Sequence, residues 1–465
     1  MRVQEICCIG AGFVGGPTMA VIAHECPEIR VTVVDTNIEK IKAWNSSNLK
    51  KLPVYEPGLK DLVKKTRNKN LFFSTDIDNA IIKAQMIFLA VNTPTKKDGK
   101  GKGYAADLTN IVKCSRRIAK VSRESKIIIE KSTLPVRTAE KIKQVLKSNS
   151  TELTFEVLSN PEFLAEGTAI QDLYKSDRVL IGSDNTKRGR EALNSLISLY
   201  EKWIPKKKIL KTSVWSAELS KLASNAMLAQ RISSINSLSA LCEKSGASIK
   251  EVSKAIGMDK RIGSHFLNVS PGFGGSCFQK DILNLVYLCR NYGLHEVANY
   301  WEEIVRINDY QKSRFSNKVM EYFDNKIINK RITILGWSFK KNTNDSRESA
   351  SIYICRDLLI KGAIIHIYDP MVPSKRIISD IEYLLESDKF GEESVKELIS
   401  KVYVFANIND AVKSTEAILF LTEWDEFKRY NWKKFIRKSK KNVHLFDSRN
   451  ILDKSFAQNL YSIGN

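Results

Sequence analysis

The feature that most restricts how this 465-residue chain can fold is a glycine-rich turn between an apolar strand and a helical pattern. Gly10, Gly12 and Gly15 follow the apolar segment Glu5–Ile9, and Asp35 closes the next predicted strand. Glycines at this spacing permit a tight turn and let the backbone approach a pyrophosphate, while the helix N-terminus offers free N–H groups to its negative charge. Because the motif stands in a strand–turn–helix context and is followed by an acidic strand end, it predicts a dinucleotide-binding fold.

The surroundings of this turn predict which dinucleotide binds. Asp35 should accept hydrogen bonds from ribose hydroxyls and repel a 2′-phosphate, which favours NAD over NADP, although Lys40, one helical turn beyond, opposes that preference. Two further segments, Val91–Thr93 and Lys131–Thr133, each follow a predicted strand of the same sheet. Ligands in such folds lie beyond the carboxyl ends of the strands, so we expect both segments to line the cofactor crevice. The alternative is that each is an ordinary strand-end turn.

Strand-like and helix-like segments alternate in two parts of the chain, which predicts parallel sheets covered by helices on both faces. The predicted strands of the first part are Glu5–Ile9, Val31–Val34, Met86–Val91, Lys126–Glu130, Phe155–Leu158 and Arg178–Ile181. Those of the second part are Arg331–Leu335, Ile364–Tyr368, Val402–Phe405, Ala417–Leu421 and His444–Phe446. A long helical pattern begins after Ser213. The expected fold is α/β, with two doubly wound Rossmann-like domains (1–212 and 326–465) joined by a helical central domain (213–325).

Charge and cysteine content bear on partners and location. The formal net charge is +22, but the lysines are spread over the whole chain, so a nucleic-acid partner is disfavoured against a lysine-rich surface that attracts anionic ligands. No apolar run approaches the length that spans a bilayer, and the apolar strand at the N-terminus leaves no room for a signal peptide. The eight cysteines form no CxxC pair and no zinc pattern. We therefore expect a cytoplasmic protein without membrane, nucleic-acid or metal partners.

One cysteine stands in a context that predicts chemistry. A glycine-rich approach (residues 272–275) ends at Ser276, a good N-cap, and a helical pattern runs onward from Cys277. A cysteine in the first turn of a helix has its thiolate stabilised by the positive end of the helix dipole. Asp281, four residues on, should share its helix face. The alternative of a buried core thiol is disfavoured by the glycines and by the charged neighbours Lys280 and Asp281.

A second stretch lies inside the long predicted helix. Glu218, Lys221 and Asn225 share one stripe of that helix. A lysine and an amide on one face could clamp a developing alkoxide or hydrate. A solvated charged stripe fits the same pattern equally well.

A third stretch predicts a pair of carboxylates. Asn160 and Pro161 resemble the start of a short helix, from which Glu162 and Glu166 would project on one side. Such a pair could serve as a general base and its neighbour, or could be plain acidic residues of a first helical turn. Histidine is scarce, with five in the chain and none in these stretches, so the proton of an alcohol would pass to a lysine, a carboxylate or a bound water.

Long motifs in a fixed order show that the sequence resembles the UDP-glucose 6-dehydrogenases, within the UDP-glucose/GDP-mannose dehydrogenase family, over nearly the whole chain. They are GAGFVGGP (10–17), VNTPTK (91–96), EKST (130–133), SNPEFLAEGTAI (159–170), ELSKLASNA (218–226), AIGMDKRIG (255–263), GFGGSCFQKD (272–281) and FKKNTNDSRES (339–349). The chain departs from the family pattern at Asn268, where animal members usually carry lysine, and at Lys40, where arginine is common.

The resemblance implies a reaction and an assembly. UDP-glucose would be oxidised to UDP-glucuronate by two successive hydride transfers to NAD, through a thiohemiacetal and then a thioester on Cys277. The central domain would build a dimer contact, within a dimer-based hexamer, and the C-terminal domain would bind UDP.

The resemblance also assigns residues to roles. The catalytic set is Cys277 as nucleophile, Lys221 for the oxyanion, Asp281 for water, Glu162 and Thr133 for proton transfer, and Asn225. The NAD contacts are Gly10, Gly12, Phe13, Val14, Gly15, Asp35, Lys40, Val91, Asn92, Thr93, Ser132, Thr133, Glu166, Lys280 and Arg347. The contacts to the nucleotide sugar are Glu162, Phe163, Leu164, Lys221, Asn225, Arg261, Phe273, Gly274, Phe339, Lys340 and Arg449.

Two alternatives stay open on the sequence. One is a related nucleotide-sugar dehydrogenase, acting on GDP-mannose or a UDP-N-acetyl-hexosamine, or releasing the aldehyde after a single oxidation. The other is a basic binding protein that keeps an inactive dehydrogenase scaffold. Salt-sensitive RNA binding without NADH production would favour that last hypothesis.

Overall fold

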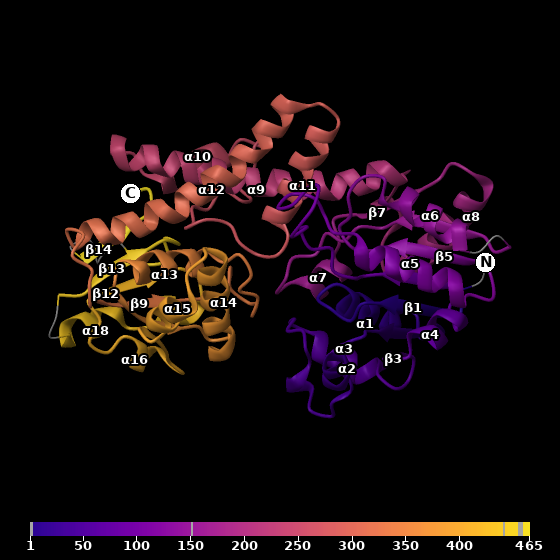
Figure 1. The fold of residues 1–465 in the computed structure, drawn as a ribbon, viewed down its shortest axis with the longest axis horizontal. Helices are drawn as coiled ribbons and strands as arrows, with labels where there is room; N and C mark the ends of the chain where they lie inside the picture. Colours follow the sequence, from indigo (N-terminus) through magenta and orange to yellow (C-terminus); the bar gives the residue numbers. More distant parts are fainter. Residues whose placement is uncertain (1–2, 150–151, 440–441, 454–458) are drawn as a thin grey trace. The chain divides into compact units, whose positions relative to one another are not determined.

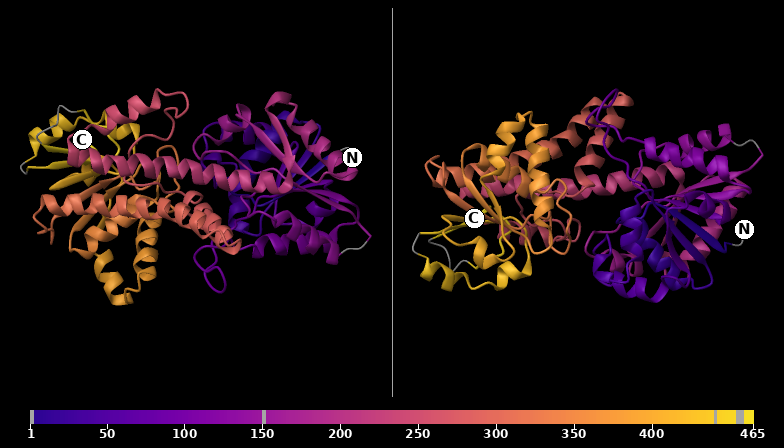
Figure 2. Two further views of the ribbon diagram at one scale, coloured as in Figure 1. Left: turned by 90° about the horizontal axis from the view of Figure 1, so that it is seen from above. Right: turned by 60° about the horizontal axis from the view of Figure 1, so that its bottom comes forward.

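The computed structural model describes residues 3–149, 152–439, 442–453 and 459–465, which form two compact units. The first unit comprises Met1–Ser224 and Leu283–Gly293, and the second comprises Asn225–Ile282 and Leu294–Asn465. Two helices, α9 (Val214–Ser245) and α11 (Phe278–Asn291), contribute residues to both units. The long helix expected after Ser213 is thus confirmed as α9, which Figure 2 shows without interruption.

The first unit is built, within the described residues, on an eight-stranded sheet. Its strands, in order across the sheet, are β3 (Leu71–Ser74), β2 (Arg30–Val34), β1 (Glu5–Ile9), β4 (Met86–Leu89), β5 (Lys126–Glu130), β6 (Phe155–Ser159), β7 (Val179–Ser183) and β8 (Ile209–Ser213). The expectation of a fully parallel sheet is wrong at one edge, where β7 pairs antiparallel with β6. The β6–β7 connection carries only the six-residue helix α7 (Ala169–Tyr174), and antiparallel neighbours need no full crossover.

Helices cover both faces of this sheet (Figure 1), and each face has its own apolar core. One core receives α1 (Gly15–Glu25), α2 (Ile38–Asn45), α3 (Leu59–Thr66), α7 and α8 (Lys187–Tyr200). The other receives α4 (Ile77–Lys83), α5 (Thr109–Val121), α6 (Thr138–Asn149) and the start of α9. Alternation along β1 feeds both cores, because Ile6 and Cys8 face the first and Cys7 and Ile9 the second.

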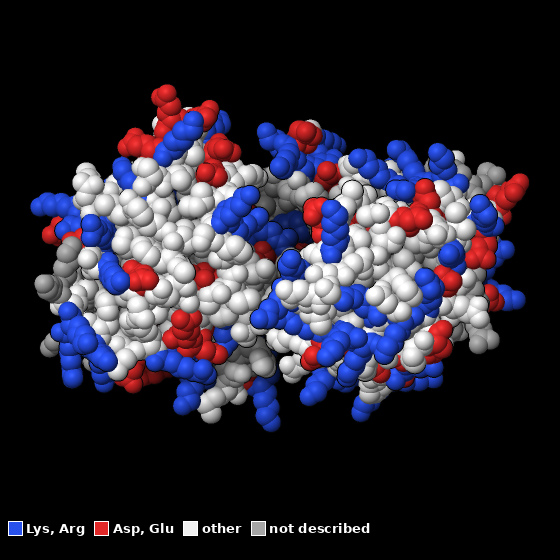
Figure 3. Space-filling model, turned by 90° about the horizontal axis from the view of Figure 1, so that it is seen from below, with Lys and Arg blue, Asp and Glu red and all other residues white. Residues whose placement is uncertain are grey.

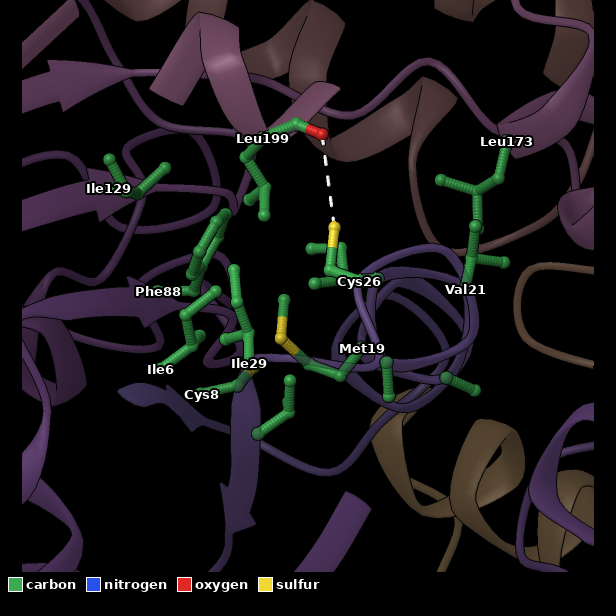
Figure 4. Close-up of a cluster of buried hydrophobic side chains, with 14 of the residues drawn as sticks. Ile6, Cys8, Met19, Val21, Cys26, Ile29, Phe88, Ile129, Leu173 and Leu199 are labelled. Carbon is green, nitrogen blue, oxygen red and sulfur yellow. Dashed lines mark hydrogen bonds between the residues drawn. The ribbon is translucent and has the colours of Figure 1, made fainter. Parts of the chain in front are cut away.

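Figure 4 shows part of the first core, where Met19 of α1 and Cys26, the residue that follows α1, lie among aliphatic and aromatic side chains of the strands and of α8. The Cys26 thiol is directed at the carbonyl oxygen of Leu199, 4.0 Å away. This packing holds α1, and therefore the glycine turn that precedes it, rigidly on the sheet.

The second unit contains, within its described residues, a six-stranded parallel sheet. The strand order is β11 (Val402–Val404), β10 (Ile364–Tyr368), β9 (Arg331–Leu335), β12 (Ala417–Phe420), β13 (His444–Asp447) and β14 (Leu460–Ser462). One face packs on α13 (Ala350–Ile360), α14 (Ser374–Ser387), α15 (Glu392–Ile399), α10 (Ile249–Gly257), α12 (His295–Tyr322) and the later turns of α9. The other face packs on α16 (Ile408–Ala411), α17 (Asp425–Arg429) and α18 (Trp432–Lys438).

The predicted fold class is confirmed: two doubly wound α/β sheets are joined by a stretch, residues 214–325, that is helical and contains no strand. Each predicted strand is present within a few residues of its expected bounds, whereas β3, β8 and β14 were not predicted. These three strands lie at the edges of their sheets, and β8 has one buried residue followed by four that are exposed or half-buried, which leaves no continuous buried apolar run. In each sheet the strand order reverses once, at β1/β4 and at β9/β12, and such reversals are where ligands bind.

The surface agrees with the expected spread of charge. On the face drawn in Figure 3, Lys and Arg side chains are interspersed with Asp and Glu rather than gathered in one stripe. Across the described residues, no helix combines the length and the apolar character needed to span a bilayer. The same residues hold no cluster of three or more His, Cys, Asp or Glu side chains suited to a metal ion.

Candidate active site

A cavity of about 380 Å³ lies in the first unit where the strand order reverses. Among the predicted NAD contacts, those that line it are Gly10, Gly12, Asp35, Lys40, Val91 and Asn92. Helices α4 and α5 supply further wall residues that the sequence did not indicate, namely Ile77, Asn110, Lys113, Cys114 and Arg117. The cavity therefore has a polar floor at the glycine turn and a mixed apolar and cationic wall.

The glycine turn suits a dinucleotide on its own geometry. Gly10 has a positive φ of 114°, and a Cβ there would lie 2.3 Å from the carbonyl oxygen of Ala90. A Cβ on Gly15 would lie 2.0 Å from the carbonyl oxygen of Gly10, whereas a Cβ on Gly12 would meet no protein atom within 4 Å. The protein itself thus requires glycine at the first and third positions but not at the second, which is what a backbone that must admit a ligand predicts.

The N-terminus of α1 is left open for an anion. Its N-cap residue, Val14, makes no side-chain cap among the described residues, and the first turn has no acidic residue. Phe13 and Val14 are half-buried and complete the turn. The positive end of the helix dipole fits the pyrophosphate of NAD.

Asp35 is held in its ionised form by this turn. Its carboxylate accepts hydrogen bonds from the N–H groups of Ala11 and Asn37 and pairs with the Lys40 ammonium at 2.8 Å. Burial opposes the charged form, but the hydrogen bonds from Lys40, Asn37 and Ala11 outweigh it and lower the pKa of Asp35. Lys40 therefore neutralises the carboxylate that is predicted to bind ribose. This ion pair accounts for the presence of both residues on the wall of one cavity.

The loops after β4 and β5 lie together, as their sequence positions predict. The Ser132 hydroxyl donates to the carbonyl oxygens of Leu89 and Val91, and the Thr93 hydroxyl donates to that of Thr133. Of these loops, Val91 and Asn92 reach the cavity wall. Ser132 and Thr133 are half-buried and fix its shape from behind.

The predicted helix at Asn160 is absent, which corrects the expected capping. Residues 160–168 form a loop, and the first helix after β6 is α7, which begins at Ala169. The Asn160 side chain is buried and donates to the carbonyl oxygen of Leu180, so it joins β6 to β7 instead of capping a helix. In place of a shared helix face, Glu162 is buried whereas Glu166 is half-buried on the loop.

A cation–aromatic stack lies on the same loop. The ring of Phe163, a predicted substrate contact, has the Arg178 guanidinium 3.9 Å and the Lys221 ammonium 5.2 Å from its centroid. Leu164 next to it donates its N–H to Glu162. Three of the predicted substrate residues, Glu162, Phe163 and Lys221, are thus brought together within the first unit.

The stripe on α9 is buried, so the alternative of a solvated charged face is wrong. Glu218, Lys221 and Asn225 are each less than 9 % exposed. Glu218 accepts hydrogen bonds from the N–H groups of Arg137 and Ala139 at the start of α6. It also lies beside Glu130 of β5, where burial first, and then the Glu218 charge, raises the pKa of Glu130.

In the second unit, Cys277 lies one residue nearer the N-terminus of α11 than predicted. The helix begins at Phe278, and the carbonyl oxygen of Cys277 accepts the first helical hydrogen bond, from the Asp281 N–H. Cys277 is therefore itself the N-cap, and Ser276, which was expected to cap, places its hydroxyl 3.6 Å from the Cys277 sulfur. The thiol still stands at the positive end of the helix.

Cys277 differs from the other cysteines in exposure. All eight lie in the described part of the chain, six are buried, Cys114 is half-buried, and Cys277 alone is exposed. Burial raises the pKa of Cys8 to about 12 and that of Cys114 to about 11, which makes thiolate chemistry at those positions unfavourable. The structure therefore contradicts the alternative that Cys277 is a core thiol.

Asp281 forms a buried cluster one helical turn beyond Cys277. Its carboxylate accepts hydrogen bonds from the Asn225 amide at 2.6 Å and from the Lys280 ammonium at 2.6 Å. Asp281 is 1 % exposed, so these two donors stabilise a charge that burial would otherwise disfavour. Lys280, predicted to contact NAD, is engaged by this carboxylate.

The glycine-rich approach to Cys277 packs against the motif 339–349. The Gly275 N–H donates to the carbonyl oxygen of Arg347, and a Cβ on Gly274 would lie 2.5 Å from the carbonyl oxygen of Glu348. Phe273 is buried, with its N–H and carbonyl both bonded to the Asn308 side chain of α12. Asn308 was not predicted, because an amide on an amphipathic helix carries no local signal of its partner.

The second reversal of strand order brings together three of the predicted contacts to the nucleotide sugar, Phe339, Lys340 and Arg449. Arg449 follows β13, and its guanidinium donates to the carbonyl oxygens of Phe339 and Leu421. Glu423, a residue missed in the sequence, lies 3.3 Å from the same guanidinium. Lys340 lies with its ammonium 5.6 Å from the centroid of the Phe339 ring, so aromatic and cationic groups suited to a nucleotide share this end of the sheet.

The acidic residue that ends β10 distinguishes this sheet from the first. Asp369 corresponds in position to Asp35, but it is buried and accepts hydrogen bonds from Trp337, Ser338, Met371, Val372 and Trp424. A carboxylate so fully used has no capacity left for a ribose. The second sheet therefore lacks the dinucleotide geometry of the first.

Two predicted contacts have side chains that pair with a carboxylate two residues away in the sequence. The Arg261 side chain is 90 % exposed, and its guanidinium forms a bidentate pair with Asp259. Arg347, predicted to contact NAD, likewise forms a bidentate pair with Asp345.

Three family sequence models match the chain: the NAD binding domain of the UDP-glucose/GDP-mannose dehydrogenase family at residues 4–204, its central domain at 215–310 and its UDP binding domain at 333–454. The chain is 53% identical to the UDP-glucose 6-dehydrogenase of Mus musculus over 97% of this chain and 90% of that protein. It is 53% identical to the enzyme of that name from Drosophila melanogaster over 97% and 93% of the two chains. The solved UDP-glucose dehydrogenase of Pyrobaculum islandicum superimposes with a TM-score of 0.82, at 26% identity, over 99% and 97%. The chain therefore belongs to the UDP-glucose/GDP-mannose dehydrogenase family and is an NAD-dependent oxidoreductase.

Proposed function

We propose that this protein oxidises the sugar of UDP-glucose to a carboxylate in two NAD-dependent steps, with Cys277 holding the half-oxidised sugar. The observation that carries the proposal is the exposed thiol at the N-terminus of α11, one helical turn from the buried Asp281 cluster. An accessible thiol beside the positive end of a helix is disposed to be a nucleophile. High identity to enzymes named UDP-glucose 6-dehydrogenase supports the choice of substrate.

The chain's own residues supply binding and proton handling. NAD, when bound at the glycine turn, accepts a hydride from the sugar carbon at each oxidation. In the first step the hydroxyl proton passes to a base, which we assign to Glu162 with Thr133, while Lys221 stabilises the alkoxide. The Cys277 thiolate then adds to the aldehyde carbon, forming a C–S bond and an oxyanion.

The second oxidation converts the thiohemiacetal to a thioester, and water then attacks the acyl carbon. We assign the positioning of that water to Asp281, with Asn225 and Lys280 holding the carboxylate. Cleavage of the C–S bond releases the acid and returns the thiol. We assign Phe339, Lys340, Gly274, Phe273 and Arg449 to the nucleotide, Phe163, Leu164 and Arg261 to the remaining substrate contacts, and Glu166, Lys280 and Arg347 to NAD.

Stoichiometry and one substitution test this function. Purified protein is incubated with UDP-glucose and excess NAD, and NADH and UDP-glucuronate are counted. We expect two NADH for each acid formed, and we expect Cys277→Ala to form no acid at a measurable rate. One NADH with released aldehyde, or acid formation by Cys277→Ala at the normal rate, would contradict the covalent route. GDP-mannose and UDP-N-acetyl-hexosamines in parallel assays test the substrate.

We further propose a cytoplasmic homo-oligomer, a dimer-based hexamer, with domains at 1–212, 213–325 and 326–465. All eight cysteines lie in the described residues and none forms a disulfide there, which favours a reducing compartment. Exposed Leu241, Met258 and Tyr300, on or next to helices of residues 213–325, are suited to a contact between copies. Sedimentation at several protein concentrations tests this assembly, and a monomer throughout would refute it.

A further inference from the structure

A buried lysine at the end of β5 has no role in the assignments above. Lys131 is 4 % exposed, and its ammonium lies 3.0 Å from Glu162 Oε2, 3.1 Å from Asn160 Oδ1 and 3.3 Å from the Tyr200 hydroxyl oxygen. The Tyr200 hydroxyl in turn donates to Asn160 at 2.6 Å. All of these groups belong to the first unit, and they come from β5, the loop 160–168 and α8.

Glu162 is the point at which this cluster meets the loop 160–168. One carboxylate oxygen accepts the Leu164 N–H at 2.7 Å, and the other has the Lys131 ammonium as its charged neighbour. The far end of the loop is held separately, because the buried Glu56 carboxylate accepts the N–H groups of Gly167 and Ala169. Lys131 therefore controls the half of the loop that carries Glu162, Phe163 and Leu164.

A polar cavity of about 190 Å³ adjoins the pair. Its charged and polar lining includes Lys131, Asn160, Glu162, Arg178 and Tyr200. A cavity of this size and polarity can hold water beside the pair. The space would also accept a guanidinium in place of the ammonium.

We propose that Lys131 is a positioning residue, whose buried ammonium holds the Glu162 carboxylate and, through it, the first half of the loop 160–168 in the place from which Glu162 acts on substrate. This inference rests on the proposed function, which assigns proton transfer to Glu162. The ammonium is itself retained as a charge, because Glu162 and Tyr200 outweigh its burial and raise the pKa of Lys131.

Because Lys131 and Glu162 form an ion pair, the pH dependence of kcat can test the proposal. Removing Lys131 would leave the Glu162 carboxylate buried without its counter-ion, and such a carboxylate takes up a proton more readily. The other ionisable groups that face the pair are Cys8 of β1, Tyr200 of α8, and Asp172, Lys175, Asp177 and Arg178 around the cavity. These groups stay in place in the Lys131 and Glu162 variants below.

The experiment is a double-mutant cycle on the full-length protein, with kcat and KM measured against pH using UDP-glucose and NAD. Glu162→Gln should lower kcat by about 100-fold or more, as expected for loss of a positioned acid–base group. Lys131→Met should lower kcat by about 10-fold or more and move the acidic limb of the kcat profile to higher pH. In the Glu162→Gln background, Lys131→Met should lower kcat no further, because it acts through the residue already removed.

Two variants separate positioning from loss of stability. Lys126→Met removes the other buried lysine of β5, whose ammonium binds the carbonyl oxygens of Ile82 and Ala84. It should lower the Tm and leave the kcat profile unchanged. Lys131→Arg should restore the wild-type profile. If Lys131→Met does not fold, Tyr200→Phe, which removes a hydroxyl between Lys131 and Asn160, should move the acidic limb in the same direction by a smaller amount.

Each outcome bears on a different statement. Multiplied losses in the double variant, or a Lys131→Met variant that lowers only the Tm as Lys126→Met does, would overturn the inference while the function stands. Wild-type kcat in Glu162→Gln would remove the role of Glu162, and the inference with it. Absence of NADH formation by the wild-type protein would instead refute the proposed function.

Discussion

At the scale of single residues, the three glycines of the turn after β1 are required for different reasons. The protein itself excludes a larger side chain at Gly10 and Gly15, because a Cβ at either position would overlap a carbonyl oxygen. Gly12 meets no such restriction and borders the cavity. Glycine is thus needed at Gly12 to leave room for the ligand, and at Gly10 and Gly15 to allow the fold.

This difference predicts opposite responses to alanine. Gly12→Ala should leave the Tm of the free protein within about 1 °C of wild type, because its Cβ enters open space, but should weaken NAD binding by about 10-fold or more. Gly15→Ala should destabilise the free protein by about 1–3 kcal/mol through overlap with Gly10. Thermal unfolding with and without NAD measures both effects. A Gly12→Ala variant with wild-type NAD affinity would refute the placement of the pyrophosphate.

At the scale of elements, two buried carboxyl groups join β5 to α9 and α6. Glu130 ends β5, and Glu218 lies on the first turns of α9 and binds N–H groups at the start of α6. Burial raises the pKa of both groups, and in Glu130 the neighbouring Glu218 charge raises it further. The folded protein therefore keeps a proton here that the unfolded chain releases.

This proton makes stability depend on pH in a defined direction. The contribution is fully present below the ordinary carboxyl pKa of about 4.5 and is lost as pH rises through the raised folded-state values. Glu130→Gln, which mimics the protonated acid, should therefore reduce the loss of unfolding free energy between about pH 5 and pH 8 by about 1 kcal/mol or more. Denaturant titrations at several pH values measure this slope.

A matched control is available on α8. Glu191 is an exposed carboxylate of the same unit, and Glu191→Gln should leave the pH slope unchanged. If Glu130→Gln also kept the wild-type slope, the two carboxyl groups would not share a proton in the way described.

At the scale of the whole molecule, two sheets of the same architecture have different capacities. The first reversal of strand order has an open glycine turn and a carboxylate on a cavity wall, whereas in the second the corresponding Asp369 is consumed by backbone and tryptophan donors. The second instead presents Arg449, Phe339 and Lys340. One chain can therefore hold a dinucleotide in one unit and a uridine nucleotide in the other.

Hydrogen exchange tests that division. NAD alone should slow amide exchange at residues 10–16 and 110–117, and UDP alone should slow it at residues 336–341 and 447–450, because each ligand protects the loops that it contacts. Arg449→Ala should abolish the protection by UDP and keep the protection by NAD. Protection of the first unit alone by both ligands would contradict the assignment of UDP to the second sheet.

Local patterns in the chain were sufficient to predict most strands of both sheets, the strand–turn–helix at the glycines, the long helix and a Cys277 outside the core. Each of these depends on the periodic burial or backbone conformation of neighbouring residues, which a short segment encodes. The edge strands β3, β8 and β14 were missed, because their residues are only partly buried, whereas the edge strand β11 was predicted. The helix at Asn160 was predicted wrongly because its amide binds a strand 20 residues away.

Which charged side chains pair with one another in the interior was decided by the tertiary structure alone. Whether Glu218, Lys221 and Asn225 faced water or protein, and whether Lys131 met Glu162, followed from how strand ends and helices pack. Partners that are distant in sequence leave no mark in the local pattern of either residue. The types of the reactive groups could therefore be read from the chain, but the neighbours that set their charge and position could be read only from the fold.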